Sequence, residues 1–287
     1  MPAEYHPLRG ILLMTAAVLC FALLDATAKH LSQTYPVPML VWARYTLHCL
    51  LMVVFLAPSL RWKLVKTQRP GLQIVRALML VGTTGFAMAA FRHLPLAETT
   101  ALIFVTPLIV ALLAGPFLGE KLRPLHWGAS LFGFLGALLI ARPGGALNPT
   151  GIALVLAAAL CYSIYQIQTR LLSPTENTLT LLFYTALVGT VSMSLAAPLY
   201  WGGPWPDWRD GLMIMTLGLY GGAGHFLLTH AFRLAPATML SPFLYVQLIW
   251  ASLLGGLVFD HWPDGLTFAG MAIIAAASLT LALTQRR

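Results

Sequence analysis

The chain has 287 residues, of which 59% are hydrophobic and 9% are charged. Soluble domains carry about 25% charged residues, so this composition excludes a water-soluble enzyme, a nucleic-acid-binding protein and a disordered chain. The net charge of +8 does not indicate nucleic-acid binding, because the basic residues form short clusters between long apolar segments. Such a pattern is typical of a membrane protein.

The apolar segments predict an all-α membrane protein with ten transmembrane helices. The first segment is too long for a signal peptide, and we expect it to remain as the first helix. Bounded by Pro, Gly and charged residues, the expected spans are 9–31, 37–57, 71–92, 95–117, 124–142, 150–171, 177–199, 211–232, 235–259 and 264–284. The cysteines lie inside these segments without close Cys or His neighbours, so they predict packing residues and no metal or cofactor site; they are Cys20, Cys49 and Cys161.

The distribution of basic residues predicts that both termini are cytoplasmic. Eleven basic residues fall on the side of the N-terminus and four on the other. The larger group is Arg9, Arg61, Lys63, Lys66, Arg69, Lys121, Arg123, Arg170, Arg233, Arg286 and Arg287. The smaller group is Lys29, Arg92, Arg142 and Arg209.

An internal repeat relates the two halves of the chain at an offset of 141 residues. Residues 10–31 and 151–172 are identical at eight of 22 aligned positions, and residues 90–95 match 231–236 in the same register. Each half, 1–145 and 146–287, holds five spans, and because five is odd the second half enters the membrane from the opposite side. The sequence therefore predicts two inverted five-helix repeats, an architecture of secondary transporters with a central binding site.

The segment 91–101 (FRHLPLAETTA), followed by 106–108 (TPL) and 118–121 (LGEK), resembles the EamA family of the drug/metabolite transporter superfamily. The resemblance covers essentially the whole chain. The second half departs from it, because Met239 stands where Glu98 would map and 259–261 (FDH) replaces Leu-Gly-Glu. The resemblance implies a bacterial inner-membrane protein, a monomer or dimer without a cofactor, that carries amino acids, related metabolites or drugs, often outward.

Ionisable residues at membrane depth are costly unless they are paired or hydrated, so they are candidate functional residues. Asp25 and Arg44 lie at similar distances from the turn near residue 34, and we expect a contact between them, direct or through water. This pair either fixes the first hairpin or binds substrate. His48 lies one turn from Arg44 and is expected to be a packing residue.

Two further ionisable residues lie in the third and fourth spans. Glu98 is a candidate for proton coupling, because partial burial would favour its protonated form; the alternative is an interfacial, snorkelling carboxylate at a helix N-terminus. Arg76 is expected to snorkel to the cytoplasmic surface, while Thr83 on the same helix face would line a path for an anionic group.

The second half offers aromatic and amide groups in place of charges, which suit a zwitterionic or flat organic solute. Ordinary helix packing is the alternative for about half of them. The candidate substrate-binding residues are Tyr162, Tyr165, Gln166, Tyr220, His225, Tyr245, Gln247 and Trp250. We rank His225 first, because Gly221, Gly222 and Gly224 before it allow close helix approach.

Two prolines, Pro107 and Pro242, interrupt the fourth and ninth spans and are candidate hinges. The absence of a G-x-x-x-x-G-K-[ST] sequence argues against an ATP-driven pump. No H-E-x-x-H or G-x-S-x-G occurs to support a multi-span enzyme. The leading hypothesis is a secondary exporter of amino acids and related metabolites, and the alternative is an uptake carrier for a cofactor-like molecule such as riboflavin or S-adenosylmethionine.

Overall fold

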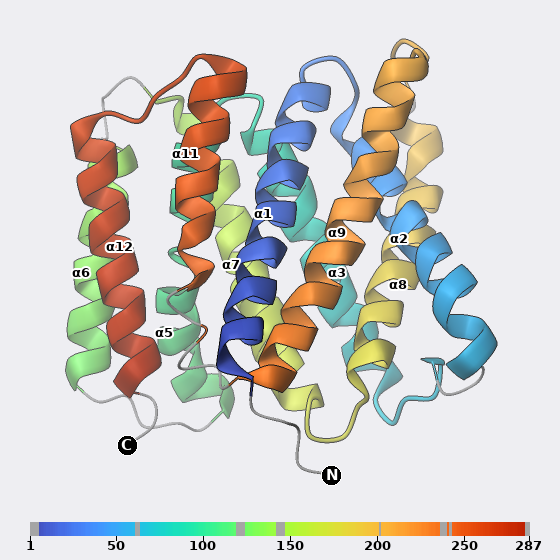
Figure 1. The fold of residues 1–287 in the computed structure, drawn as a ribbon, viewed down its shortest axis with the longest axis horizontal. Helices are drawn as coiled ribbons and strands as arrows, with labels where there is room; N and C mark the ends of the chain where they lie inside the picture. Colours follow the sequence, from blue (N-terminus) through green and yellow to red (C-terminus); the bar gives the residue numbers. More distant parts are fainter. Residues whose placement is uncertain are drawn as a thin grey trace.

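The computed structural model describes residues 6–60, 64–118, 124–141, 147–200, 202–235, 240 and 243–284. These residues form a bundle of helices with no strand among them (Figure 1). The helices are α1 (Pro7–Ser32), α2 (Val37–Leu60), α3 (Pro70–Ala90), α4 (Leu96–Ile103), α5 (Thr106–Leu118), α6 (Pro124–Ala141), α7 (Pro149–Leu172), α8 (Thr178–Tyr200), α9 (Trp208–Leu234), α11 (Val246–Phe259) and α12 (Gly265–Thr284).

The helices confirm the prediction of ten membrane spans. Seven segments are long and apolar enough to cross a bilayer, and three shorter apolar helices complete the set at Trp127–Ala141, Val246–Phe259 and Gly265–Thr280. One of the seven, Leu96–Leu113, contains both α4 and α5. Because lipid offers no hydrogen bonds to the backbone, an all-helical bundle satisfies these groups internally.

The fourth span is broken as the proline predicted. Helix α4 ends at Ile103 and α5 begins at Thr106, with Pro107 as its second residue. Proline lacks the N–H that would continue the hydrogen-bond ladder and is well tolerated in a first turn. The other candidate hinge, Pro242, lies outside the described residues.

The two halves are inverted relative to each other. Helix α1 begins at the lower end of the bundle in Figure 1, where α12 ends, and α7 runs in the opposite direction from α1. We call the end at which α1 begins the terminal face and the opposite end the distal face. The predicted junction between residues 145 and 146 lies outside the described residues.

The same 141-residue offset relates contacts as well as sequences. Gly10 lies against Ala235, where an added Cβ would be 2.9 Å from the Ala235 Cβ, and Gly151 lies against Leu94, where it would be 2.6 Å from Cγ. Adding 141 to Gly10 gives Gly151, and adding it to Leu94 gives Ala235. The first contact is on the terminal face and the second on the distal face, so the sequence repeat is a structural two-fold symmetry.

Candidate substrate site and distal closure

A hydrogen bond near the middle of the bundle joins the two halves. The Gln247 side chain on α11 donates through Nε2 to Oδ2 of Asp25 on α1, at 3.2 Å. Asp25 is half-buried and lies about two-thirds of the way along α1. The structure thus brings together two predicted site residues that are 222 positions apart.

Arg44 does not form the direct contact with Asp25 that the sequence predicted. Its Nη1 donates instead to Oγ1 of Thr84 on α3, at 3.0 Å, while Asp25 turns toward α11. The direct form of the prediction is therefore wrong, because each group finds a neutral partner on another helix. The charge of Arg44 still acts on the Asp25 carboxyl, and a contact through water stays a prediction.

Two adjacent threonines on α3 have different partners. The Thr83 hydroxyl donates to the Met79 carbonyl of its own helix at 2.9 Å. Thr84 likewise donates to the Leu80 carbonyl, and it also contacts Arg44 and the hydroxyl of Tyr45. That Thr83 lines a path for an anionic group stays a prediction.

His225 lies on α9 beside glycines against which helices of the first half pack closely. Its ring is nearly parallel to that of His48, with centroids 6.5 Å apart, and Phe21 meets it edge-on at 5.1 Å. A Cβ on Gly224 would be 2.6 Å from the Phe21 ring, and one on Gly222 would be 3.5 Å from His48. The predicted close approach is confirmed, and it places His48 in the same layer as His225.

Arg76 does not snorkel, contrary to expectation, and is only 1% exposed. Its Nε donates to Thr169 Oγ1 at 2.7 Å, and Nη2 donates to the Tyr165 hydroxyl at 2.9 Å. Its Nη1 donates to Leu181 O and to Thr185 Oγ1, both at 3.0 Å. Neutral groups from α7 and α8 therefore replace the water that a snorkelling guanidinium would seek.

Tyr165, predicted to bind substrate, is held in this structural contact. The Arg76 guanidinium lies over its ring at 4.5 Å, and the tyrosine is 8% exposed. Tyr162 stacks on the Tyr165 ring with centroids 5.7 Å apart. Tyr162 is half-buried, and so is Gln166, which lies four residues later on the same helix.

The other candidates from the second half lie on α9 and at the start of α11. Tyr220 is half-buried, and Tyr245 packs on Phe104 at 5.1 Å. Trp250 is half-buried, but its Nε1 is enclosed and has no hydrogen-bond partner among the described residues. Since a buried unpaired donor is costly, Trp250 is suited to meet an acceptor. Substrate binding by these three residues stays a prediction.

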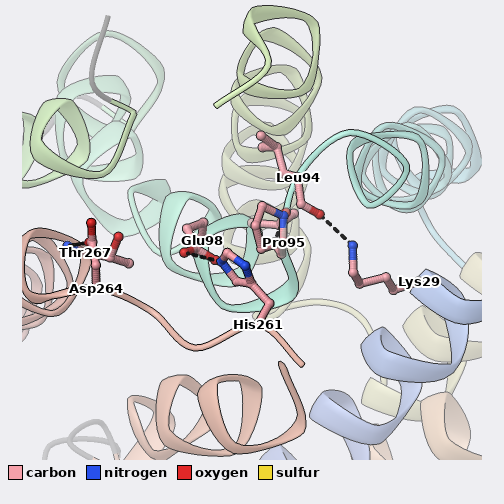
Figure 2. Close-up of polar contacts among 8 residues, drawn as sticks. Lys29, Leu94, Pro95, Glu98, His261, Asp264 and Thr267 are labelled. Carbon is pink, nitrogen blue, oxygen red and sulfur yellow. Dashed lines mark hydrogen bonds and ion pairs between the residues drawn. The ribbon is translucent and has the colours of Figure 1, made fainter. Parts of the chain in front are cut away.

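A second polar group closes the distal face (Figure 2). Glu98, in the first turn of α4, is 4% exposed, and its Oε1 lies 3.1 Å from Nε2 of His261. This burial contradicts the snorkelling interpretation of Glu98, whereas its place in the first turn of α4 agrees with a carboxylate at a helix N-terminus. His261 lies in the short connection between α11 and α12 and was missed, although its place in the FDH departure from the family pattern was a signal.

Other contacts tie the same face together. Lys29, at the end of α1, donates to the carbonyls of Phe91 at 3.0 Å and Leu94 at 2.7 Å, and it lies over the Phe259 ring at 5.4 Å. In the connection after α1, the Tyr35 hydroxyl donates to Asp210 at 2.6 Å. This hydrogen bond raises the pKa of Tyr35 to about 12. The distal face is thus closed by contacts between the two halves.

The described residues contain no group of three His, Cys, Asp or Glu side chains placed to hold a metal ion. The polar groups are instead single charges and aromatic rings distributed over both repeats.

Comparison with known proteins identifies the family. Residues 8–142 and 149–283 each match the EamA-like transporter family. The chain belongs to this family. It is 29% identical to the S-adenosylmethionine uptake transporter of Rickettsia bellii, over 78% of this chain and 76% of the relative. It is 27% identical to the riboflavin transporter of Vibrio cholerae, over 96% and 93% of the two chains.

The family contains carriers named for opposite directions. The pseudopaline exporter CntI of Pseudomonas aeruginosa is 28% identical to this EamA-family chain, over 96% of it and 97% of the exporter. A solved crystal structure shares the fold, with a TM-score of 0.68 and 21% identity over 98% of this chain and 99% of its own. The chain is therefore a multi-pass membrane transporter of the EamA family.

Proposed function

We propose that the protein is a secondary transporter that exports amino acids and related small metabolites or drugs across the bacterial inner membrane by alternating access. The observation that carries the proposal is the pair of incompletely satisfied charges at mid-depth, Asp25 and Arg44. A guanidinium has five N–H donors, and among the described residues Arg44 uses one of them, on Thr84. A carboxylate accepts about four hydrogen bonds, and within the described part of the chain Asp25 accepts one, from Gln247.

Charges in this position are expensive to leave without partners in a membrane. A zwitterionic solute supplies both missing partners, with its carboxylate at Arg44 and its ammonium group at Asp25. The charge of Arg44 acts on the Asp25 carboxyl group, so both charges can meet one solute in this proposal. The two side chains then bind substrate and do not merely fix the first hairpin.

The aromatic groups around these charges provide for the rest of the solute. His48, His225 and Phe21 form one cluster of rings, and Trp250 offers an indole N–H that has no acceptor among the residues that the structure describes. Flat faces with a hydrogen-bond donor suit an aromatic or heterocyclic side chain. We include Tyr162, Gln166 and Tyr220 in this site as additional residues that contact the solute.

Alternating access follows from the inverted repeats, which rock against each other around a central site. Pro107, at the break between α4 and α5, serves as a hinge, and we assign the same role to Pro242. The positive-inside orientation places the terminal face in the cytoplasm, so the closed distal face is the outer one. The protein works as a monomer or dimer and uses no cofactor.

The alternative is an uptake carrier for a cofactor-like metabolite. The relatives named for riboflavin and S-adenosylmethionine favour it. S-adenosylmethionine is itself an α-amino acid with an attached heterocycle, so the same charges and rings would serve it.

Transport by purified protein in liposomes tests the proposal. Labelled amino acids, riboflavin and S-adenosylmethionine are offered with and without an imposed pH gradient, and we expect exchange or accumulation of at least one amino-acid-like solute above empty liposomes. Riboflavin transport alone would favour the alternative. If liposomes with and without the protein took up equal amounts of every labelled solute, the result would contradict a transporter of this substrate class.

A further inference from the structure

A hollow with a volume of about 230 Å³ lies between α5 and α6, and α6 is at one edge of the bundle (Figure 1). Its floor is formed by Val105, Leu108 and Ser130, which are 5%, 2% and 5% exposed. Its rim on α6 is more than half exposed and consists of Trp127, Leu131 and Phe134. The hollow is therefore open to the surroundings of the bundle and closed toward its core.

The hollow runs along the two helices. The lining residues within 105–112 and those within 127–134 both follow the spacing i, i+3, i+4 and i+7, so each segment offers one continuous helix face. Residues 127 and 134 are seven positions apart, which corresponds to about 10 Å along a helix axis. A narrow hollow of this length fits part of an extended hydrocarbon chain.

The position of the hollow determines what fills it. Both walls belong to membrane-spanning segments, Leu96–Leu113 and Trp127–Ala141, so the molecules next to the rim are lipids. An empty hollow would lose dispersion contacts. Water needs about two to four polar partners, and the polar side-chain groups of the described lining are the Ser130 hydroxyl and the Trp127 indole N–H. A lipid acyl chain is therefore the best-matched occupant.

Ser130 indicates where the chain carries an acceptor. Its hydroxyl is enclosed and has no hydrogen-bond partner among the described residues, whereas Ser163 and Ser252 each donate to the carbonyl four residues earlier in their own helix. The equivalent position of the second half, 141 residues later, holds the buried Met271, so the fold does not require a polar residue there. Because a buried unpaired donor is costly, an acceptor on the bound chain would stabilise this arrangement.

The depth of Ser130 matches one particular acceptor. Helix α6 begins at Pro124 on the terminal face, and the indole of Trp127 is suited to the membrane–water interface there. Ser130 lies three residues further along the helix, about 4.5 Å deeper. In a glycerophospholipid the ester carbonyls lie just inside the headgroup, whereas a free fatty acid has its carboxylate at the interface and no acceptor further in.

We propose that the hollow between α5 and α6 binds one acyl chain of a membrane phospholipid, whose ester carbonyl accepts a hydrogen bond from Ser130. The chain then runs along the helices past Leu108 toward Val105 and Phe134. None of the residues that line the hollow belongs to the proposed substrate site, so this lipid site is a second binding site on the protein.

Lipids with and without the ester carbonyl test the hydrogen bond. Delipidated protein in detergent is titrated with dioleoyl phosphatidylethanolamine and with its dialkyl ether analogue, and native mass spectrometry measures the bound fraction. S130A should weaken binding of the diacyl lipid about two- to tenfold, the effect of losing one hydrogen bond, and leave binding of the ether lipid unchanged. S252A removes a buried hydroxyl on α11 and is the control, which should bind both lipids like the parent protein.

A photoactivatable lipid locates the chain. Phosphatidylethanolamine with a diazirine in one acyl chain is cross-linked to the protein, and peptide mass spectrometry maps the label. We expect label within 105–112 and 127–134, and its loss with excess dioleoyl phosphatidylethanolamine. I109W should fill the hollow and reduce this labelling; Trp250 is at the equivalent position of the second half, so the fold accommodates an indole there. L195W, at a 76% exposed position of α8, is the control and should keep the parent labelling.

Three results would overturn the lipid site. The first is an S130A variant that binds both lipids as the parent protein does, or that weakens both equally. The second is labelling of α8 as strong as that of α5 and α6. The third is displacement of the photoactivatable lipid by oleic acid more effectively than by the phospholipid, which would assign the hollow to a free fatty acid. None of these measurements uses transport, so the lipid site stands or fails independently of the proposed function.

Discussion

Phe104 and Tyr245 lie against each other with their ring centroids 5.1 Å apart, and they are counterparts in the two repeats, separated by 141 positions. A residue that contacts its own counterpart lies beside the two-fold axis that relates the halves. Phe104 follows the last residue of α4, and Tyr245 precedes the first residue of α11. The axis therefore passes next to the break in the fourth span.

The Asp25 and Arg44 assignments predict opposite substrate selectivities. Asp25→Asn should reduce transport of amine-bearing solutes at least about tenfold, which corresponds to about 1.4 kcal/mol, and spare their deaminated analogues. Arg44→Gln should reduce transport of carboxylate-bearing solutes and spare the decarboxylated amines. Competition between the analogues in liposomes measures both effects.

Two exposed residues serve as controls for these charge changes. Asp260→Asn changes a charge at a left-handed position, with φ 52°, that asparagine tolerates, and Arg209→Gln changes a charge in the first turn of α9; neither should alter selectivity. Equal losses for all analogues in D25N, or failure of D25N to fold, would favour the hairpin-fixing role instead.

Arg76 should contribute to stability through the shape of its guanidinium group. Arg76→Lys keeps the charge but loses the planar fork that reaches Tyr165, Thr169 and Thr185 together. We expect R76K to lower the free energy of unfolding by about 2–3 kcal/mol, as for the loss of hydrogen bonds to a buried charged group. Thermal unfolding in detergent measures the change. Arg209→Lys, on an exposed residue, is the control, and an R76K variant as stable as R209K would contradict the structural role.

The fold was predictable because its signals are local or periodic. Apolar segments of about 20 residues mark the spans, and the identities between 10–31 and 151–172 mark the repeat. The environment of Arg76 has no such signal. Its partners Thr169 and Thr185 lie 93 and 109 positions away, and the sequence does not indicate that their helix faces point toward Arg76. Hydrophobicity alone therefore predicted snorkelling.

The internal repeat did not predict the contact between Glu98 and His261 either. Glu98 and His261 are 163 positions apart, and the 141-residue offset aligns them with Met239 and Glu120, so symmetry does not connect them. By contrast, the glycines of α9 did predict the close approach at His225. A residue without a side chain allows a helix to come close whichever part of the chain that helix belongs to. Contacts that break the internal symmetry required the structure.

Two glycines on α6 should respond in opposite ways to the same substitution. A Cβ on Gly136 would lie 2.9 Å from the backbone oxygen of Gly270 on α12, whereas one on Gly128 meets nothing within 4 Å. Gly136→Ala should therefore lower the free energy of unfolding by about 1–3 kcal/mol through overpacking. Gly128→Ala should raise it by up to about 1 kcal/mol, the helix preference for alanine. Thermal unfolding of the two variants side by side tests the α6–α12 contact, and equal effects would contradict it.

A disulfide between α4 and α11 should hold the distal face closed. A Cβ built on Gly255 would be 4.0 Å from the Leu96 Cβ, within the 3.5–4.5 Å that a disulfide requires. In a background without Cys20, Cys49 and Cys161, the L96C/G255C variant should transport when reduced and stop when oxidised. Recovery after reduction shows that closure, and not damage, stops it. The Gly255 site is tight, with the His261 carbonyl 3.2 Å from the added Cβ, so the single G255C variant is the control for local disturbance. Full transport by the oxidised, cross-linked protein would contradict a cycle in which these two helices separate.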